Sequence, residues 1–254
     1  MPVSVIMPAF NAARFIEPAL RSLVRERQAV DLDVIVVDDG STDATRAIVE
    51  TFARDFPEVR LLRNPRKGIA AARNTGLEHL HADCELVTFL DADDVSYPGR
   101  IERQRALLLH DPTIDVLYGM VEMFMQLDDA TLSPAAGSPT KRLRGPYLQA
   151  AMYRRAAIDR VGRFDESFRQ GCDSDFVLRA IEHQCRLVLD DGVAAYYRRH
   201  DANVTLNVEE RQREFMLASL KWAVRYRLRN GGRLPPIFAE LFLRKGAMLE
   251  EFDE

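Results

Sequence analysis

The sequence predicts an α/β fold in which a largely parallel sheet is covered by helices. Apolar runs of four to six residues alternate with segments whose apolar residues recur at helical spacing, which is the pattern of repeated βαβ units. Three of these runs lead directly into polar turns, and in such sheets ligands bind outside the carboxyl ends of the strands. The predicted strands are residues 3–7, 33–37, 59–62 and 85–90.

The first strand, "VSVIM" at residues 3–7, leads into the turn "PAFN". Ile16, Leu20 and Leu23 then recur at helical spacing and predict a helix over this segment. Pro18 places the start of that helix close by, because proline suits a first turn, where its missing amide hydrogen is not needed.

The second strand, residues 33–37, runs into the turn "DDGSTD". We expect Asp38 to brace this turn and Ser41 or Thr42 to be the N-cap of the next helix, because a hydroxyl oxygen can accept a first-turn amide hydrogen. A structural role is therefore predicted for residues 40–43.

The strand at residues 85–90 ends in "DADD", which places Asp91, Asp93 and Asp94 within four positions. Crowded carboxylates repel each other, so the cluster must be solvated, paired with bases or bound to a cation. Mg²⁺ and Mn²⁺ prefer hard oxygen ligands, and Mg²⁺ usually takes one or two carboxylates plus phosphate oxygens. On these acids alone, a solvated turn and a metal site both remain open.

The alternation loosens beyond about residue 120. Residues 125–146 are rich in Pro, Gly, Ser and charge, and they predict a mobile loop or a short edge hairpin. From residue 206 the pattern is helical, with two apolar stripes. The first stripe is Leu217, Leu220, Val224 and Leu228, and the second is Phe238, Leu241, Phe242, Met248 and Leu249.

The expected use of this tail is packing against the rest of the chain or against a second subunit in a homodimer. Trp222 is expected to take part in that packing. Lys221, Arg225 and Arg229 flank the first stripe, so a peripheral contact between these helices and an anionic membrane surface is the alternative.

Composition excludes several classes of protein. A chain of 254 residues, 47% hydrophobic and 29% charged, predicts one globular domain or two small ones, and a net charge of −4 argues against a dedicated nucleic-acid binder. The three cysteines, Cys84, Cys172 and Cys185, lack zinc-ribbon spacing and suit a reducing compartment. No signal peptide and no membrane-spanning apolar run is visible, so we expect a cytoplasmic protein, with the inner face of the membrane as the alternative.

Seven segments stand in this order along the chain: "VSVIMPAFN", "VIVVDDGSTDAT", "KGIAAARNTGL", "FLDADD", "VGRFDESF", "GCDSDFVLRA" and "YYRRHDANVT". In these segments and their order the sequence resembles glycosyltransferase family 2, over roughly residues 3–205. The resemblance implies the GT-A fold, with a Rossmann-like, mixed but mostly parallel sheet flanked by helices. It implies a catalytic domain over residues 1–205, divided into a nucleotide-binding half (1–95) and an acceptor half (96–205), and a helical C-terminal extension over 206–254.

The activity implied by this resemblance is that of a metal-dependent, inverting, hexosyltransferase-type enzyme. Its donor would be a nucleotide-diphosphate sugar, with a UDP-sugar favoured, and its acceptor a hydroxyl of a saccharide or of a lipid-linked molecule. Such a reaction belongs to polysaccharide or glycoconjugate biosynthesis.

The resemblance also implies which residues contact the nucleotide. Phe10 matches an aromatic residue that stacks on the base, with packing in the core as the alternative. Asp39 matches the acid that accepts a hydrogen bond from the base. Pro8 and Ala92 fall on further donor-binding positions.

Four basic residues are candidates for the diphosphate. Lys67 lies just before a predicted helix, and Arg73 lies within it. A helix N-terminus with nearby cations suits an anion. A surface helix with scattered charge is the alternative. Arg198 and Arg199 could neutralise the leaving diphosphate or form a solvated flank.

The metal would be Mn²⁺ or Mg²⁺, and the resemblance places it at a DXD motif made by Asp91, Ala92 and Asp93. Asp91 would approach the ribose or the cation, whereas Asp93 and His200 would ligate the cation. Asp94 is expected to cap the following turn.

Asp173 falls on the carboxylate that takes the proton from the acceptor hydroxyl, so it is the predicted catalytic base. The family commonly has glutamate before the base, whereas this chain has Cys172, for which packing is expected rather than a nucleophilic role. Asp175 and Arg179 are expected to form a local ion pair.

Two alternatives to a glycosyltransferase stay open. A nucleotidyltransferase also couples an α/β nucleotide fold to acidic metal ligands, but a glycine-rich phosphate loop would be expected where this chain has "PAFN". A nucleotide-sugar-binding protein that has lost catalysis is the second alternative, and Cys172 is the feature that favours it.

Overall fold

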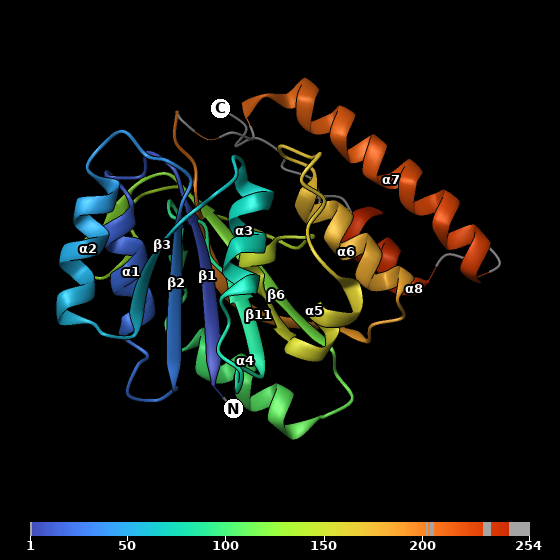
Figure 1. Ribbon diagram of the computed structural model, residues 1–254, viewed down its shortest axis with the longest axis horizontal. Helices are drawn as coiled ribbons and strands as arrows, with labels where there is room; N and C mark the ends of the chain where they lie inside the picture. Colours follow the sequence, from blue (N-terminus) through green and yellow to red (C-terminus); the bar gives the residue numbers. More distant parts are fainter. Residues whose placement is uncertain (1, 202, 204–205, 231–234, 244–254) are drawn as a thin grey trace.

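The computed structural model describes residues 2–201, 203, 206–230 and 235–243, and it confirms the predicted α/β fold. A mixed sheet lies at the centre, and helices flank it on both faces (Figure 1). The strands of this sheet are β1 (Val3–Ala9), β2 (Leu32–Asp38), β3 (Val59–Arg63), β4 (Leu86–Phe89), β5 (Val95–Ser96), β6 (Val116–Phe124), β9 (Lys141–Leu143), β10 (Ala151–Arg154) and β11 (Leu187–Arg198).

The helices connect these strands or follow them. Leu148–Ala150 adds a 3₁₀ turn, η1, before β10, and Ala239–Leu243 adds a π-helical turn, η3, at the end of the described chain. The helices are α1 (Ile16–Val24), α2 (Thr45–Asp55), α3 (Ile69–Glu78), α4 (Arg100–His110), α5 (Arg155–Val161), α6 (Cys172–Glu182), α7 (Val208–Asn230) and α8 (Pro236–Phe238).

The strand order is β3-β2-β1-β4-β10-β6-β11-β5, with β9 paired to β6. The first four strands of this order are parallel to one another, as the βαβ pattern predicts, whereas β10 is antiparallel to both of its neighbours. β11 is parallel to β6 and antiparallel to β5. The four predicted strands are therefore confirmed as β1 to β4, and their carboxyl ends lie at one edge of the sheet.

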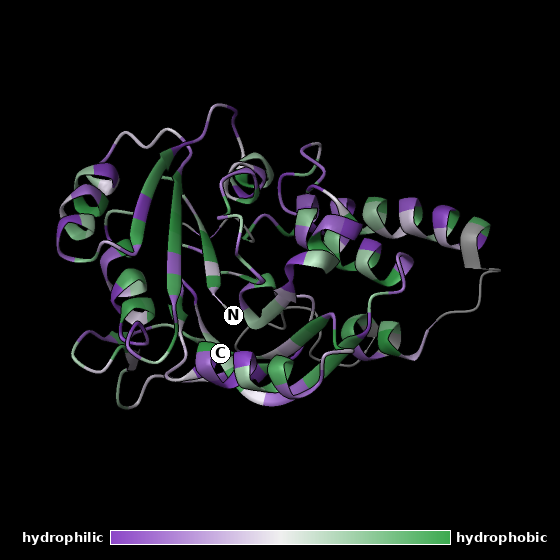
Figure 2. Cartoon of the chain, turned by 60° about the horizontal axis from the view of Figure 1, so that its bottom comes forward, coloured by the Kyte–Doolittle hydropathy of each residue, from purple (hydrophilic) through white to green (hydrophobic). Residues whose placement is uncertain are grey.

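Apolar side chains cover both faces of this sheet. Val5 and Met7 of β1 lie in one buried cluster with residues of α1, whereas Ile6 lies in a second cluster with residues of α3 and α6. Successive side chains of a strand point to opposite faces, so a strand buried on both sides needs apolar residues at every position. In Figure 2 the central strands are accordingly largely hydrophobic.

Two local predictions are confirmed, one of them only in part. Residues 125–146 contain the short hairpin of β7 (Leu127–Asp128) and β8 (Ser133–Pro134), one of the two forms expected, and also β9, which was not predicted. The helix expected near Pro18 is confirmed, because α1 begins at Ile16 and holds this proline in its first turn.

The predicted N-cap of α2 is wrong. The helix begins at Thr45, and the side chain of Ser41 instead accepts the amide hydrogen of Asn11 at 3.0 Å. The amide of Thr42 donates to the Asn11 side-chain oxygen at 2.8 Å. Ser41 and Thr42 thus bond to the turn after β1 rather than to α2. They connect the ends of the neighbouring strands β1 and β2. Asp38 does brace its turn, because it accepts the amide hydrogen of Ser41 at 3.1 Å.

The C-terminal helix α7 packs on α6 along the outer edge of the molecule (Figure 1). Trp222 is confirmed as a packing residue, since only 3% of it is exposed and its ring stacks on Phe238 at 4.8 Å. Leu241 and Phe242 of the second predicted stripe lie in the same buried cluster, whereas Met248 and Leu249 lie outside the described residues. The boundary proposed between residues 205 and 206 stays a prediction.

The prediction that the first stripe of α7 packs against the rest of the chain is wrong. Its four side chains are 45% to 82% exposed. The opposite face of α7 turns inward because it carries Trp222, and because Lys221 and Arg225 on its border bind Asp165 and Glu182 of the body at 2.9 and 2.8 Å. The exposed stripe is Leu217, Leu220, Val224 and Leu228.

We predict that Trp222→Ala lowers the free energy of unfolding by about 3–5 kcal/mol, because it leaves a large cavity where α7 packs on Phe238 of α8. Leu228→Ala on the same helix is the matched control and should change it by less than about 0.5 kcal/mol, because the Leu228 side chain is 82% exposed. Urea denaturation followed by circular dichroism measures both values. Equal effects of the two substitutions would contradict this packing of α7.

Candidate functional site

The polar turns after β1, β2 and β4 meet at one edge of the sheet. β1 lies between β2 and β4, and its register places Ala9 opposite Asp38. The amide of Asp39 then donates to the carbonyl oxygen of Ala9 at 2.8 Å. Phe10, Asp39 and Asp91 therefore start from adjacent strand ends.

Phe10, Asp39 and Lys67 form the first part of the site. Phe10 is 55% exposed, so the alternative that it packs in the core is excluded. The Lys67 ammonium lies 5.4 Å from the centre of the Phe10 ring and donates to the backbone oxygen of Asp39 at 2.8 Å. The Asp39 carboxylate accepts hydrogen bonds from Asn64 at 2.6 Å and from the amide of Gly68 at 2.9 Å. This part of the site presents an aromatic face beside one cation and one carboxylate.

Pro8 and Ala92, the other two predicted donor-binding residues, are both buried. Pro8 lies within β1, opposite Val37 of β2, and Ala92 lies in the turn that follows β4. Both positions are next to the strand ends that carry the polar residues. A direct role of either residue in donor binding stays a prediction.

Arg73 of α3 connects two of the predicted carboxylates. Its guanidinium donates to Asp91 at 3.0 Å and, through its other terminal nitrogen, to Asp173 at the start of α6. Only 1% of Arg73 is exposed, so the alternative of a surface helix is wrong here. Burial acts to lower the pKa of Arg73, but the charges of Asp173 and Asp91 outweigh it and raise this pKa above its ordinary value. Arg73 is thus a permanent cation shared by two acids.

Asp91 lies between the other acids of the site. Burial raises the pKa of Asp91 to about 6, with further contributions from the negative charges of Asp173 and Asp93, although Arg73 acts in the opposite direction. The carboxylates of the predicted metal ligand and of the predicted base therefore both lie within electrostatic reach of Asp91.

Asp93 and His200 are brought together from different halves of the chain. The Asp93 carboxylate lies 2.9 Å from Nε2 of His200, whose ring stacks on Phe15 with 4.3 Å between ring centres. Asn203 contacts both groups, at 3.3 Å from the Asp93 carboxylate and 3.1 Å from the His200 ring nitrogen. Both of these polar contacts with the ring lie at Nε2, and the stacking on Phe15 fixes the plane of the ring.

Asp93 and His200 fit a Mn²⁺ or Mg²⁺ ion only when a bound ligand supplies further oxygen atoms. In the part of the chain that the structure describes, no three His, Cys, Asp or Glu side chains converge as a metal site. One carboxylate and one imidazole are an incomplete set. Mg²⁺ sites are usually completed by substrate phosphates and water, so a nucleotide diphosphate would fit this pair.

Asp94 does not cap the following turn, which corrects that prediction. Only 1% of it is exposed, and its carboxylate accepts hydrogen bonds from the amide of Arg198 at 2.9 Å and from the Gln149 side chain at 3.0 Å. Arg198 is not a solvated flank either, because it is 7% exposed and packs over the rings of Phe15 and Phe124. Asp94 therefore connects the acidic turn to the end of β11.

Cys172 and Asp173 begin α6. Burial raises the pKa of the Cys172 thiol, and the nearby charge of Asp173 raises it further, so the thiol stays protonated and is a poor nucleophile. Its sulfur lies 3.2 Å from the Arg73 guanidinium and 3.3 Å from the Asp173 carboxylate. The expected ion pair between Asp175 and Arg179 is confirmed at 2.8 Å.

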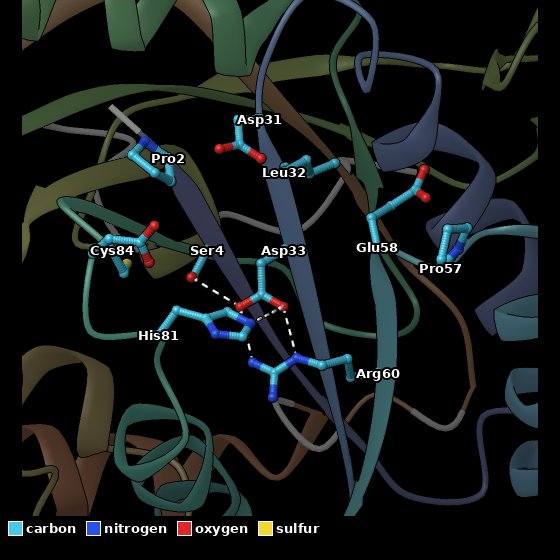
Figure 3. Close-up of a pocket in the computed structure, with 11 residues that line it drawn as sticks. Pro2, Ser4, Asp31, Leu32, Asp33, Pro57, Glu58, Arg60, His81 and Cys84 are labelled. Atoms are coloured by element: carbon cyan, nitrogen blue, oxygen red, sulfur yellow. Dashed lines mark hydrogen bonds and ion pairs between the residues drawn. The ribbon is translucent and has the colours of Figure 1, made fainter.

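A separate cavity of about 280 Å³ lies at the opposite edge of the sheet (Figure 3). It includes Ser4 and Asp33, near the amino ends of β1 and β2, together with His81 and Cys84. The Asp33 carboxylate is already bound by Arg60, at 2.8 and 2.9 Å, and by Ser4 at 3.1 Å. This cavity lies near the amino ends of the strands, whereas the site described above lies at their carboxyl ends. The two are therefore separate.

Three residues that contact this site were not predicted from the sequence: Phe15, Asn64 and Asn203. Asn203 stands three positions after His200 in "HDANVT", so its place in that segment was an available signal. Phe15 and Asn64 carried no such signal, because their contacts with His200 and Asp39 cross long stretches of chain.

Comparison with known proteins gives a family and a fold. The sequence profile of Glycosyl transferase family 2 matches residues 4–172. A relative from Escherichia coli, named UDP-Glc:alpha-D-GlcNAc-diphosphoundecaprenol beta-1,3-glucosyltransferase WfgD, is 35% identical over 122 residues, which cover 48% of this chain and 46% of the relative. The chain spans 31% to 60% of the length of this relative and of two others, from E. coli K12 and Bacillus subtilis.

Two solved structures share the fold. S. aureus TarS in complex with UDP-GlcNAc superposes with a TM-score of 0.70 at 22% identity, over 91% of this chain and 68% of TarS. The mannosyltransferase PcManGT from Pyrobaculum calidifontis, in complex with GDP-Man and Mn²⁺, gives 0.69 at 24% identity, over 94% of this chain and 67% of its own. No helix of the described residues is long and apolar enough to span a membrane.

We predict that Cys172 of the folded protein resists alkylation by iodoacetamide at pH 7.5, because its thiol is buried and protonated. Peptide mass spectrometry should find the modification at Cys172 only after unfolding in guanidinium chloride. Rapid labelling of Cys172 in the folded chain would restore the nucleophile alternative.

Proposed function

The chain belongs to Glycosyl transferase family 2, and from this premise we propose that it transfers a sugar from a nucleotide-diphosphate donor to an acceptor hydroxyl with inversion at the anomeric carbon. The observation that carries the proposal is the contact of one buried guanidinium, Arg73, with both Asp91 and Asp173. It brings Asp91, the first residue of the predicted DXD motif, and Asp173, the predicted base, to the same place.

The proposed donor site is the cluster of Phe10, Asp39 and Lys67. The exposed ring of Phe10 offers a flat apolar face on which a base can stack. Asp39 would accept a hydrogen bond from the base, because a carboxylate has acceptor positions beyond those used by Asn64 and Gly68. A UDP-sugar is the proposed donor, supported by the UDP-GlcNAc bound to TarS and by the name of the E. coli relative.

Asp93 and His200 are the proposed ligands of Mn²⁺ or Mg²⁺. A cation bound there would supply positive charge to the diphosphate as it leaves. The Mn²⁺ complex of PcManGT supports this proposal. Phe15 holds the His200 ring toward Asp93 by stacking, and the Asn203 side-chain oxygen accepts the His200 backbone amide hydrogen at 2.7 Å.

Asp173 is the proposed general base. Its carboxylate would take the proton of the acceptor hydroxyl while the hydroxyl oxygen attacks the anomeric carbon from the face opposite the diphosphate. The bond from the anomeric carbon to the diphosphate breaks, and the electron pair leaves with the diphosphate. Arg73 orients the Asp173 carboxylate for this step, and no covalent intermediate with the protein is required.

We predict that Asp173→Asn lowers the rate of UDP release about 10²- to 10⁴-fold, because it removes the acceptor for the proton. UDP binding, measured by calorimetry, should be unchanged, since the proposed nucleotide contacts lie elsewhere. Asp191→Asn is the control, because the Asp191 side chain is fully exposed. Undiminished turnover by Asp173→Asn would remove this residue from the mechanism.

The same assay separates the alternatives when it is run with a panel of UDP-sugars, GDP-sugars and nucleoside triphosphates, with Mn²⁺ and with chelator. Release of nucleoside diphosphate that requires the metal identifies the transferase. Release of pyrophosphate from nucleoside triphosphates identifies a nucleotidyltransferase, and binding without release identifies a protein that has lost catalysis.

The exposed stripe of α7 leads to a second proposal: this face rests on an anionic membrane surface, where a lipid-linked acceptor would reside. The exposed positions of α7 between residues 211 and 228 carry five large apolar side chains, two basic residues and no acidic residue. Such a face inserts its apolar groups among lipids while its arginines attract anionic headgroups. The basic residues are Arg213 and Arg227.

We predict that the chain floats with vesicles containing phosphatidylglycerol and that Leu220→Gln combined with Leu228→Gln strongly reduces its recovery. These side chains are 59% and 82% exposed, so their replacement spares the core. Neutral vesicles are the control. Recovery that is unchanged by the substitutions would contradict the proposal, and a dimer in sedimentation that these substitutions dissociate would show that a second copy covers the stripe.

A further inference from the structure

Glu214 is a buried carboxylate of α7 that the proposed mechanism does not use. It is 5% exposed, and one of its oxygens accepts the amide hydrogens of Gln170 and Gly171, each at 2.7 Å. The amide of Arg169 donates to both oxygens, at 3.0 and 3.1 Å. Three consecutive backbone amides thus end on one side chain that lies more than 40 residues away in the sequence.

These amides belong to the turn that leads into α6. Gly171 is the N-cap of this helix and, being glycine, it has no side chain with which to cap it. Amides that precede or begin a helix lack partners within the helix and must find them elsewhere. Asp173, the proposed base, is the second residue of α6. Glu214 therefore fixes the backbone only two residues before the base.

Electrostatics supports the same assignment. Burial acts to raise the pKa of Glu214, but hydrogen bonds from the three amides outweigh burial and lower it. The amides near a helix start carry partial positive charge, which makes a carboxylate a stronger partner there than a neutral side chain.

Gly171 permits this contact. A Cβ atom at this position would lie 2.9 Å from the Cβ of Glu214 and 3.1 Å from the ring of Phe168. The backbone of Gly171 has a φ of −86°, which any residue can adopt, so close approach rather than backbone conformation requires the glycine.

We propose that Glu214 is a positioning residue for Asp173. It holds the turn at 169–171, and through it the start of α6, at the place where Arg73 meets the Asp173 carboxylate. Helix α7 then contributes to the geometry of the catalytic site through Glu214. This inference rests on the proposed function, because it assumes that Asp173 is the base.

The test uses Glu214→Ala, Glu214→Gln and a matched control, each in the 254-residue chain. The control is Glu210→Gln, one turn earlier on α7, because Glu210 contacts the side chains of Arg169 and Gln170 but none of the three amides. Turnover is measured as UDP release from a UDP-sugar that the wild type uses. Hydrogen exchange, followed by mass spectrometry, reports on the amides of residues 169–175.

We expect Glu214→Ala to lower kcat about 10²-fold, as displacement of a catalytic group by about 1 Å does, and to leave the donor KM unchanged. Glu214→Gln keeps one acceptor oxygen and should fall between Glu214→Ala and the wild type. Exchange at 169–175 should rise in the alanine variant and not in the control. In the Asp173→Asn background, Glu214→Ala should lower the residual rate no further, because both changes act through one group.

Three results would overturn the inference. Unchanged exchange in Glu214→Ala would contradict the contact itself. An equal loss of rate in the presence and absence of Asp173 would indicate a general structural role. Faster exchange with undiminished kcat would separate the contact from catalysis. By contrast, normal turnover by Asp173→Asn, or no UDP release by the wild type with any donor, is a failure of the proposed function and shows itself before any Glu214 variant is measured.

Discussion

The site depends on one interaction, the buried guanidinium of Arg73 between the carboxylates of Asp91 and Asp173. A cation that is only 1% exposed would be strongly unfavourable alone, and its two acidic partners would repel each other without it. The guanidinium reduces the repulsion between the two carboxylates, and the carboxylates offset the cost of burying the guanidinium. The three residues come from α3, the turn after β4 and the start of α6, so this interaction joins the two halves of the chain in addition to the pairing of β4 with β10.

The strand-end turns around Arg73 are held by hydrogen bonds to one another rather than by their own helices. Asn11, after β1, bonds to Ser41 and Thr42, which follow β2. Asn64, after β3, bonds to Asp39, which also follows β2. Asp94 extends the same arrangement to β11 through the amide of Arg198. A polar edge built in this way holds the segments that carry Phe10, Asp93 and His200, of which Phe10 is exposed and the His200 side chain is largely covered.

The C-terminal helix has two different faces. Its inner face carries Trp222, which packs with Phe238, and Glu214, which binds the turn before α6. Its outer face carries the exposed apolar stripe with two arginines, and no acidic residue is exposed between residues 211 and 228. One helix would thereby link the position of the proposed base to the surface on which a lipid-linked acceptor would be presented.

The sequence alone determined the α/β architecture, the four parallel strands, the family and the polar residues that follow the strand ends, because each depends on local periodicity or on ordered short segments. Tertiary structure alone decided which face of α7 turns inward, what Asp94 and Ser41 bind, and that Glu214 meets the start of α6. An apolar stripe is equally periodic whether it faces a core or solvent, and a polar side chain near a turn can bond locally or across the fold. The choice depends on contacts between residues tens to a hundred positions apart, and no local pattern records them.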